Sequence, residues 1–115
     1  MPDLQPAKLL RIYVAESCRS DGRPLYEVIV EKCRELQIAG ATVIRAEEGF
    51  GAGPEIHRAR LLSHDLPIEI TIVDDSVKIE RLMPVLEPLM VTGTMVVSNV
   101  QILRLRNAAA TASDR

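Results

Sequence analysis

The sequence predicts an α+β fold in which the order strand, helix, strand occurs twice along one chain. Two patterns carry this prediction: alternating apolar residues, which are typical of half-buried strands, and apolar residues at helical spacing, which follow the first strand of each half. The length of 115 residues suits one domain. We therefore expect a single domain over 1–115, with an ordered core at about 8–106 and a flexible tail at 107–115.

The first half begins with a strand over 9–15, where apolar and more polar residues alternate. A helix is expected from Pro24, because the missing N–H of proline is tolerated at the first helical position. The helical apolar stripe runs to about Ile38, and Gly40 is the expected C-terminal cap. A second strand is expected over 41–47, where Thr, Val and Ile are adjacent.

The second half repeats this pattern, beginning with an alternating strand over 66–74. An apolar stripe with helical spacing then predicts a second helix from about residue 76. Short polar side chains that favour helix N-caps precede it, at Asp74, Asp75 and Ser76.

Two prolines interrupt the second helical stripe, Pro84 and Pro88. Each removes a backbone hydrogen bond, so we expect a kink or an early helix end near them. A last strand is expected over 95–105, with an interruption at 98–99. The resulting order is βαββαβ. Right-handed crossovers place both helices on one face of a four-stranded antiparallel sheet, which is the ferredoxin-like arrangement, with a long loop between strands two and three.

The sheet face away from the helices is expected to mix apolar and polar side chains. Such a surface suits packing against copies of the same chain, and ordinary exposure to solvent is the alternative. The residues expected on this face are Leu9, Arg11, Tyr13, Glu69, Thr71 and Val73.

Composition excludes several classes of function. The net charge of −2 and the aromatic content of 3% argue against a nucleic-acid partner, which would need a basic face or stacking platforms. The apolar runs are shorter than the roughly 20 residues of a membrane span, so none is expected. The N-terminal stretch does not have the pattern of a secretory signal, and a cytoplasmic location is expected.

The connection between strands two and three is the first candidate for function, because it is too long for a hairpin turn. Glycines at alternate positions, Gly49, Gly51 and Gly53, allow the backbone to approach a ligand closely. A solvated, mobile loop is the alternative. Basic side chains that could donate hydrogen bonds nearby are Arg45, His57, Arg58, Arg60 and His64.

A second candidate lies at the end of the last predicted strand or on its extension. Arg104 and Arg106 have the same parity, so their guanidinium groups could converge on a phosphate or a carboxylate. A charged strand end in solvent is the alternative reading.

Catalytic patterns are missing from the sequence: it contains no GxSxG, HExxH or phosphate-binding Gly-Lys-Ser/Thr run. His57 and His64 have no evident third metal ligand, and the two cysteines have no metal-site spacing, so neither a metal nor an enzyme is expected. The competing hypothesis is a small phosphate-ester or acyl-phosphate hydrolase. It would use His57 or His64 as general base, together with Arg19, Arg45 or Arg58.

Four runs of residues carry a family resemblance: LRIYVxES, GRPLYExIVEK, GATVIRAxxGFG and DLPIxIxIVD. In order and spacing they resemble the PII-like uncharacterised family called domain of unknown function 190, over about 9–106. That family is similar to the nitrogen regulatory PII signal-transduction proteins. Those proteins are ferredoxin-like trimers that bind adenine nucleotides in clefts between subunits and move a long loop onto target proteins.

The resemblance implies a signalling protein and assigns roles to individual residues. Candidate ligands of an adenine nucleotide (ATP, ADP, AMP or cyclic AMP) are Gly49, Phe50, Gly51, Arg45, Arg104 and Arg106. The same resemblance implies a homotrimer, and a membrane transporter or ion channel as the partner protein. The loop that would contact the partner, within 50–65, includes Ala52, Gly53, Pro54, Glu55, Ile56, His57, Arg58 and Arg60.

Two departures from the PII pattern keep other ligands open. Ala52 and Gly53 stand where PII proteins carry a longer polar side chain that contacts nucleotide. The connection at 91–94 is shorter than the PII phosphate loop. A smaller anion, a different anion or a structural oligomer without ligand therefore remains an alternative.

Overall fold

The computed structural model describes residues 3–49, 57–58 and 65–105. The expected flexible tail at 107–115 lies outside this part of the chain. In chain order the elements are β1 (Gln5–Ala15), β2 (Arg19–Ser20), β3 (Arg23–Pro24), α1 (Leu25–Glu35), β4 (Ala41–Arg45), β5 (Glu48–Gly49), β6 (His57–Arg58), β7 (Pro67–Asp74), α2 (Ser76–Leu86), the 3₁₀ helix η2 (Glu87–Leu89) and β8 (Thr94–Ile102).

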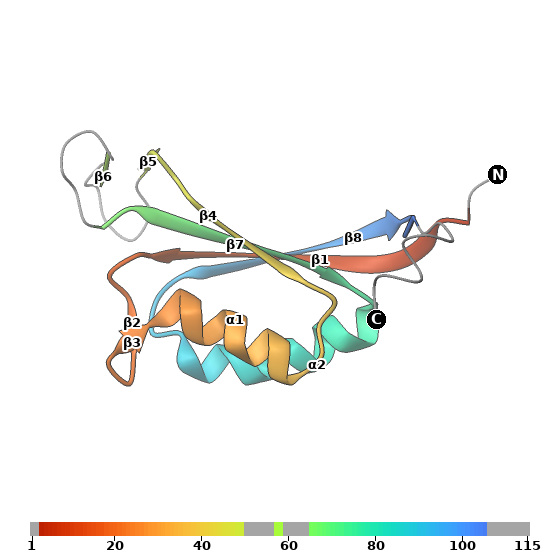
Figure 1. Ribbon diagram of the computed structural model, residues 1–115, viewed down its shortest axis with the longest axis horizontal. Coiled ribbons are helices and arrows are strands. Elements are labelled where there is room, and N and C mark those ends of the chain that lie inside the picture. The colour runs from red at the N-terminus through yellow and green to blue at the C-terminus, as the bar shows by residue number, and fades with distance from the viewer. Residues whose placement is uncertain (1–2, 50–56, 59–64, 106–115) are drawn as a thin grey trace.

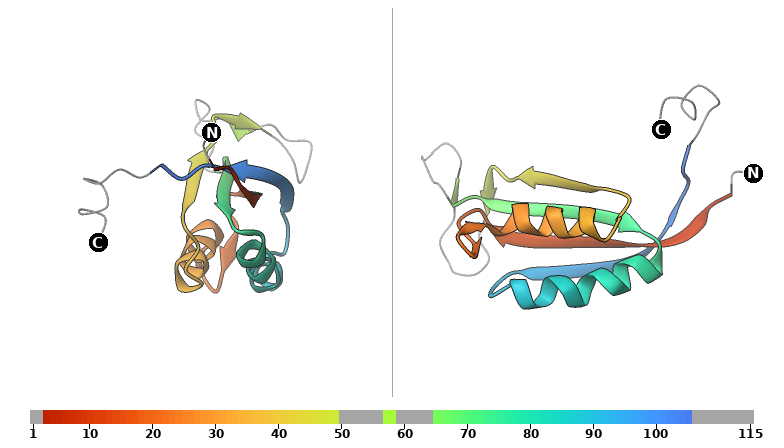
Figure 2. Two further views of the ribbon diagram at one scale, coloured as in Figure 1. Left: turned by 90° about the vertical axis from the view of Figure 1, so that its right-hand side faces the viewer. Right: turned by 60° about the horizontal axis from the view of Figure 1, so that its bottom comes forward.

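The longer elements form the predicted ferredoxin-like fold. The strands β4, β7, β1 and β8 are neighbours in that order, and each adjacent pair is antiparallel. Both described helices lie on one side of this sheet (Figures 1 and 2). The predicted order βαββαβ is confirmed. The pairs β2–β3 and β5–β6 are two short additional ladders.

The core lies between the sheet and the helices, and the predicted apolar stripes fill it. Every second residue is buried there in β1 from Leu10 to Val14 and in β7 from Ile68, as are three positions on each helix. Each such side chain contributes roughly 1.5–3 kcal/mol through burial. The residues are Leu10, Ile12, Val14, Ile68, Ile70 and Ile72 from the strands, and Leu25, Ile29, Cys33, Ile79, Leu82 and Leu86 from the helices.

The predicted ends of α1 are wrong by a few residues. Pro24 is the N-cap rather than the first helical residue, with an extended ψ of 128°. The helix ends at Glu35, before the expected Ile38, because Gln37 adopts a positive φ of 57° and turns the chain. The Ile38 N–H then donates to the Cys33 carbonyl at 2.9 Å. Gly40 is therefore not the cap.

The prediction for the second helix is confirmed at both ends. The N-cap is Asp75, one of the three candidates, although its side chain makes no capping hydrogen bond. The helix passes through Pro84 and ends at Leu86, and the short 3₁₀ helix that follows contains Pro88. No described helix is long and apolar enough to cross a bilayer.

The last strand differs from its prediction. β8 runs without a break through Ser98 and Asn99, which pair with Leu9 and Lys8 of β1. These polar residues alone do not favour a strand. Pairing with the long strand β1 supplies the backbone hydrogen bonds that keep them in one. The strand ends at Ile102, so the segment 103–105 continues beyond the sheet.

Candidate functional site

The base of the long loop lies where β4 ends and β7 begins. The two strands pair up to Arg45 and Ile68, and the Ala46 N–H then donates to the Pro67 carbonyl at 2.9 Å. Beyond this point β5 and β6 form a two-stranded ribbon in which Gly49 pairs with His57. Figure 1 shows this ribbon at one end of the sheet. The backbone therefore brings Gly49 beside His57, which belongs to the loop that the family resemblance assigns to a partner protein.

Arg45 already has a carboxylate partner at this base. Its guanidinium lies 2.5 Å from the Glu16 carboxylate, and the Arg45 side chain is 50% exposed. The Glu16 N–H donates to the Leu66 carbonyl at 2.9 Å, and the Ser17 N–H donates to the Asp65 carboxylate at 3.0 Å. The segment after β1 therefore holds both ends of the long loop, and an anion at Arg45 would share the guanidinium with Glu16.

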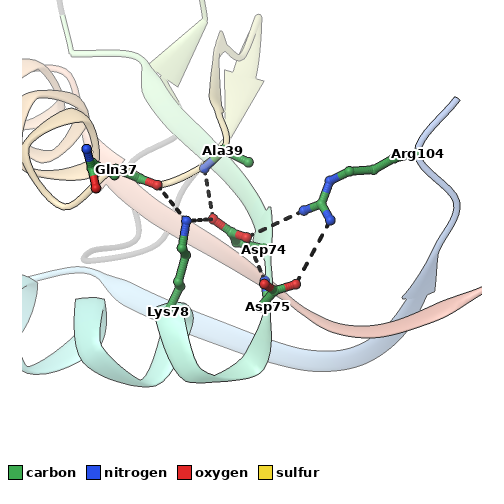
Figure 3. A network of polar contacts seen from close by, with 6 residues as sticks. All are labelled: Gln37, Ala39, Asp74, Asp75, Lys78 and Arg104. Carbon is green, nitrogen blue, oxygen red and sulfur yellow. Dashed lines mark hydrogen bonds and ion pairs between the residues drawn. The ribbon is translucent and has the colours of Figure 1, made fainter. Parts of the chain in front are cut away.

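Arg104 follows β8, and its side chain reaches the start of α2, as Figure 3 shows. One guanidinium nitrogen is 3.5 Å from Asp74 Oδ1, and the other is 4.0 Å from Asp75 Oδ1. The Arg104 side chain is 55% exposed. This geometry leaves part of the guanidinium open to solvent, where it could meet an anion.

Asp74 is the centre of the contacts around Arg104. Its side chain is only 2% exposed, and its carboxylate accepts the Ala39 N–H at 2.8 Å and the Asp75 N–H at 2.7 Å. The Lys78 ammonium lies 3.9 Å from the same carboxylate and donates to the Gln37 carbonyl at 2.9 Å. Asp74 thus joins the ends of α1 and β7 to the start of α2.

Sequence reasoning placed Asp74 only among the N-cap candidates and missed this network. A signal was present, because Asp74 continues the buried alternation of Ile68, Ile70 and Ile72. A carboxylate at a position with core parity needs several hydrogen-bond donors around it. That requirement predicts a polar network but does not name the donors, which come from distant parts of the chain.

The predicted ligand residues that the structure describes fall at two opposite ends of the sheet, with Arg45 and Gly49 at one end and Arg104 at the other. Arg45 pairs with Ile68, whereas Asp74, which holds Arg104, lies six residues further along β7, from 68 to 74. At about 3.3 Å per residue these positions are ~20 Å apart. One chain therefore does not bring Arg45 and Arg104 together.

Several predicted site residues lie outside the described part of the chain. This holds for the candidate ligands Phe50, Gly51 and Arg106 and for the partner-loop residues Ala52, Gly53, Pro54, Glu55, Ile56 and Arg60. His57 and Arg58 are described only as the backbone of β6.

The two cysteines are free and lie in different surroundings. Cys33 is buried in the core, and that burial raises the pKa of its thiol from 9.0 to about 11. Cys18 is half-buried, with its sulfur 3.8 Å from the Thr92 hydroxyl. Residues 3–49 and 65–105 contain no group of three metal-binding side chains.

Comparison with known proteins adds a family to this geometry. Residues 7–102 match the family described as DUF190, uncharacterized ACR. The chain belongs to the DUF190 family. Two relatives are UPF0166 proteins: one from Aquifex aeolicus (strain VF5) is 40% identical over 76 residues, which are 64% of this chain and 72% of the relative. The other, from Methanocaldococcus jannaschii, is 31% identical over 103 residues, which are 85% and 93% of the two chains.

Several solved structures that share this fold are of PII-like proteins. CPII from Thiomonas intermedia K12, bound to ADP and bicarbonate, superposes with a TM-score of 0.71 at 19% identity, covering 90% of the DUF190 chain and 95% of CPII. A putative PII-like signaling protein from Thermus thermophilus has a TM-score of 0.61 at 23% identity, covering 88% and 92%. The predicted family and the predicted PII-like fold are both confirmed.

Proposed function

We propose that this DUF190 protein is a non-enzymatic PII-like regulator. It assembles as a homotrimer, binds a small anionic ligand in clefts between subunits and presents the loop 50–65 to a partner protein. An adenine nucleotide is the leading ligand, since CPII, which shares the fold, was solved with ADP. The observation that carries the proposal is the separation of Arg45 from Arg104 by ~20 Å along β7. The two arginines can meet one ligand only if different subunits contribute them.

The sheet face away from the helices, which we call the open face, supports assembly into a trimer. It carries large apolar side chains that are substantially exposed in one chain, including Ile44 at 52%, Val96 at 40% and Tyr13 at 39%. Cross-strand pairing places Val96 beside Arg11 and Tyr13 beside Glu69, on the side away from the helices. A face that mixes exposed apolar and polar side chains in this way suits burial against identical chains.

The chemistry of the proposed site is recognition of an anion by guanidinium and backbone N–H groups. Arg104 of one subunit would contact the phosphate, and the loop base at Gly49 and Arg45 of the next subunit would contact the rest of the ligand. The ligand moves the loop only if it binds one loop position more tightly than another. A cytoplasmic regulator of this kind would act on a membrane transporter or ion channel through that loop.

Isothermal titration calorimetry against ATP, ADP, AMP and cyclic AMP, with and without Mg²⁺, tests the ligand. We expect micromolar binding of at least one nucleotide, which corresponds to about −8 kcal/mol. Gly51→Val and Arg104→Gln should each weaken this binding. Arg34→Gln is the matched control, because it removes one positive charge from the exposed side of α1. The absence of heat with all four nucleotides would contradict the nucleotide proposal.

A further inference from the structure

The Arg104 guanidinium, the proposed anion ligand, faces two carboxylates of its own chain. Asp74 Oδ1 is 3.5 Å and Asp75 Oδ1 is 4.0 Å from its terminal nitrogens (Figure 3). A carboxylate and a phosphate accept hydrogen bonds from the same N–H groups of a guanidinium. An anion that binds Arg104 through these two nitrogens must therefore compete with Asp74 and Asp75, which are already in place.

Asp74 does not depend on Arg104 for its own hydrogen bonds. The N–H groups of Ala39 and Asp75 donate to its two oxygens at 2.8 Å and 2.7 Å, and Lys78 balances its charge from 3.9 Å. Arg104 can leave without stranding a buried carboxylate, which is the main cost of breaking most buried ion pairs. The contact between Arg104 and Asp74 can therefore break by movement of Arg104, the more exposed partner, while Asp74 stays buried and hydrogen-bonded.

We propose that Asp74 and Asp75 form an intramolecular latch that holds Arg104 until an anionic ligand displaces them. This inference rests on the proposed role of Arg104 in anion binding. The latch lowers the affinity for the anion, because part of the binding free energy is spent in separating Arg104 from the carboxylates. Ligand binding then detaches the segment 103–105 from the start of α2.

Asp75 is the member of the latch that can be neutralised with the least disturbance. Its side chain is 60% exposed and makes no capping hydrogen bond to α2. Asp75→Asn keeps the size and the N-cap preference of the residue while it removes the charge facing Arg104. The matched control is Glu80→Gln, which likewise removes one carboxylate, from within α2. The Glu80 side chain is also 60% exposed, and its partner is a different cation, Lys8.

Brief trypsin digestion followed by mass spectrometry measures the latch without any ligand. Trypsin must take the Arg104 side chain into its own pocket to cut after residue 104, so the latch protects that bond. The products ending at Arg106 provide an internal reference. We expect Asp75→Asn to raise the ratio of products ending at Arg104 to those ending at Arg106 by about threefold, as for loss of an exposed ion pair. Glu80→Gln should leave the ratio unchanged.

Titration with ADP measures the consequence for binding. Asp75→Asn should bind ADP about threefold more tightly than the wild type, while Glu80→Gln should match the wild type. A tryptic ratio that is unchanged in Asp75→Asn overturns the latch, whatever the ADP result. A raised ratio with equal ADP affinities overturns its role in ligand binding. If no variant binds ADP, the proposed nucleotide function fails, and the tryptic ratio alone decides whether the latch exists.

Discussion

At the scale of single residues, Asp74 is a buried charge with a structural task. Its carboxylate accepts two backbone N–H groups from different connections and lies near Lys78. Asp74→Ala would leave both N–H groups without this acceptor, and hydrogen bonds to charged groups contribute about 1.5–3 kcal/mol each. We expect the free energy of unfolding in urea to fall by about 3 kcal/mol.

The control for this experiment is the neighbouring carboxylate. Asp75→Ala removes a side chain that is 60% exposed and makes no capping hydrogen bond, so its effect should stay below about 1 kcal/mol. Equal losses in the two variants would contradict the role given to Asp74.

Two glycines provide a second matched pair at this scale. Gly93 has a φ of 125°, and an added Cβ would lie 2.9 Å from the Tyr13 carbonyl oxygen. Gly93→Ala should therefore lower the melting temperature clearly, by the equivalent of about 2 kcal/mol or more. Gly40 lacks a positive φ, and a Cβ there would meet nothing within 4 Å. Gly40→Ala should be neutral or stabilising by about 0.4–1 kcal/mol; a comparable loss at both positions would count against this account.

At the scale of elements, the packing of α1 on the sheet buries the thiol of Cys33. The folded-state pKa of about 11 lies above the usual value of 9.0, so between these values the unfolded chain releases a proton that the folded chain keeps. Stability contributed by this group is therefore present below pH 9.0 and is lost as the pH rises toward about 11. Urea unfolding at several pH values should show that the free energy of unfolding falls more steeply with rising pH for the wild type than for Cys33→Ala. Parallel declines would show that the thiol does not cause the effect.

Periodicity predicted the elements well and their ends less well. The alternation in β1 and β7 and the stripes of α1 and α2 follow directly from which side chains can face the core. The end of α1 was missed because Gln37, rather than a glycine, adopts the left-handed conformation. The continuity of β8 through Ser98 was missed because pairing with β1 outweighs local preference.

The candidate site was predictable only in part, for a related reason. Sequence patterns and the family resemblance singled out Arg45 and Arg104 as anion ligands. Their carboxylate partners, Glu16 and Asp74, are distant in the sequence, and only the folded chain brings each pair together. The ~20 Å between the two arginines likewise follows from strand register, which single-chain patterns do not specify.

At the scale of the whole molecule, the proposed trimer depends on the open face of the sheet. Val96→Glu places a charge on that face, next to Arg11 in the ladder, where burial in a trimer would be costly. We expect sedimentation velocity to show a shift from trimer toward monomer. The same substitution at Val77, which is 56% exposed on α2, should leave the trimer intact.

The central claim is that the ligand site lies between subunits, and the most direct test is ADP titration of the Val96→Glu monomer by isothermal titration calorimetry. We expect this monomer to bind ADP at least about tenfold more weakly than the wild type, which is 1.4 kcal/mol, while Val77→Glu retains wild-type affinity. ADP binding of unchanged affinity by the folded monomer would contradict the claim, because one chain would then hold a complete site.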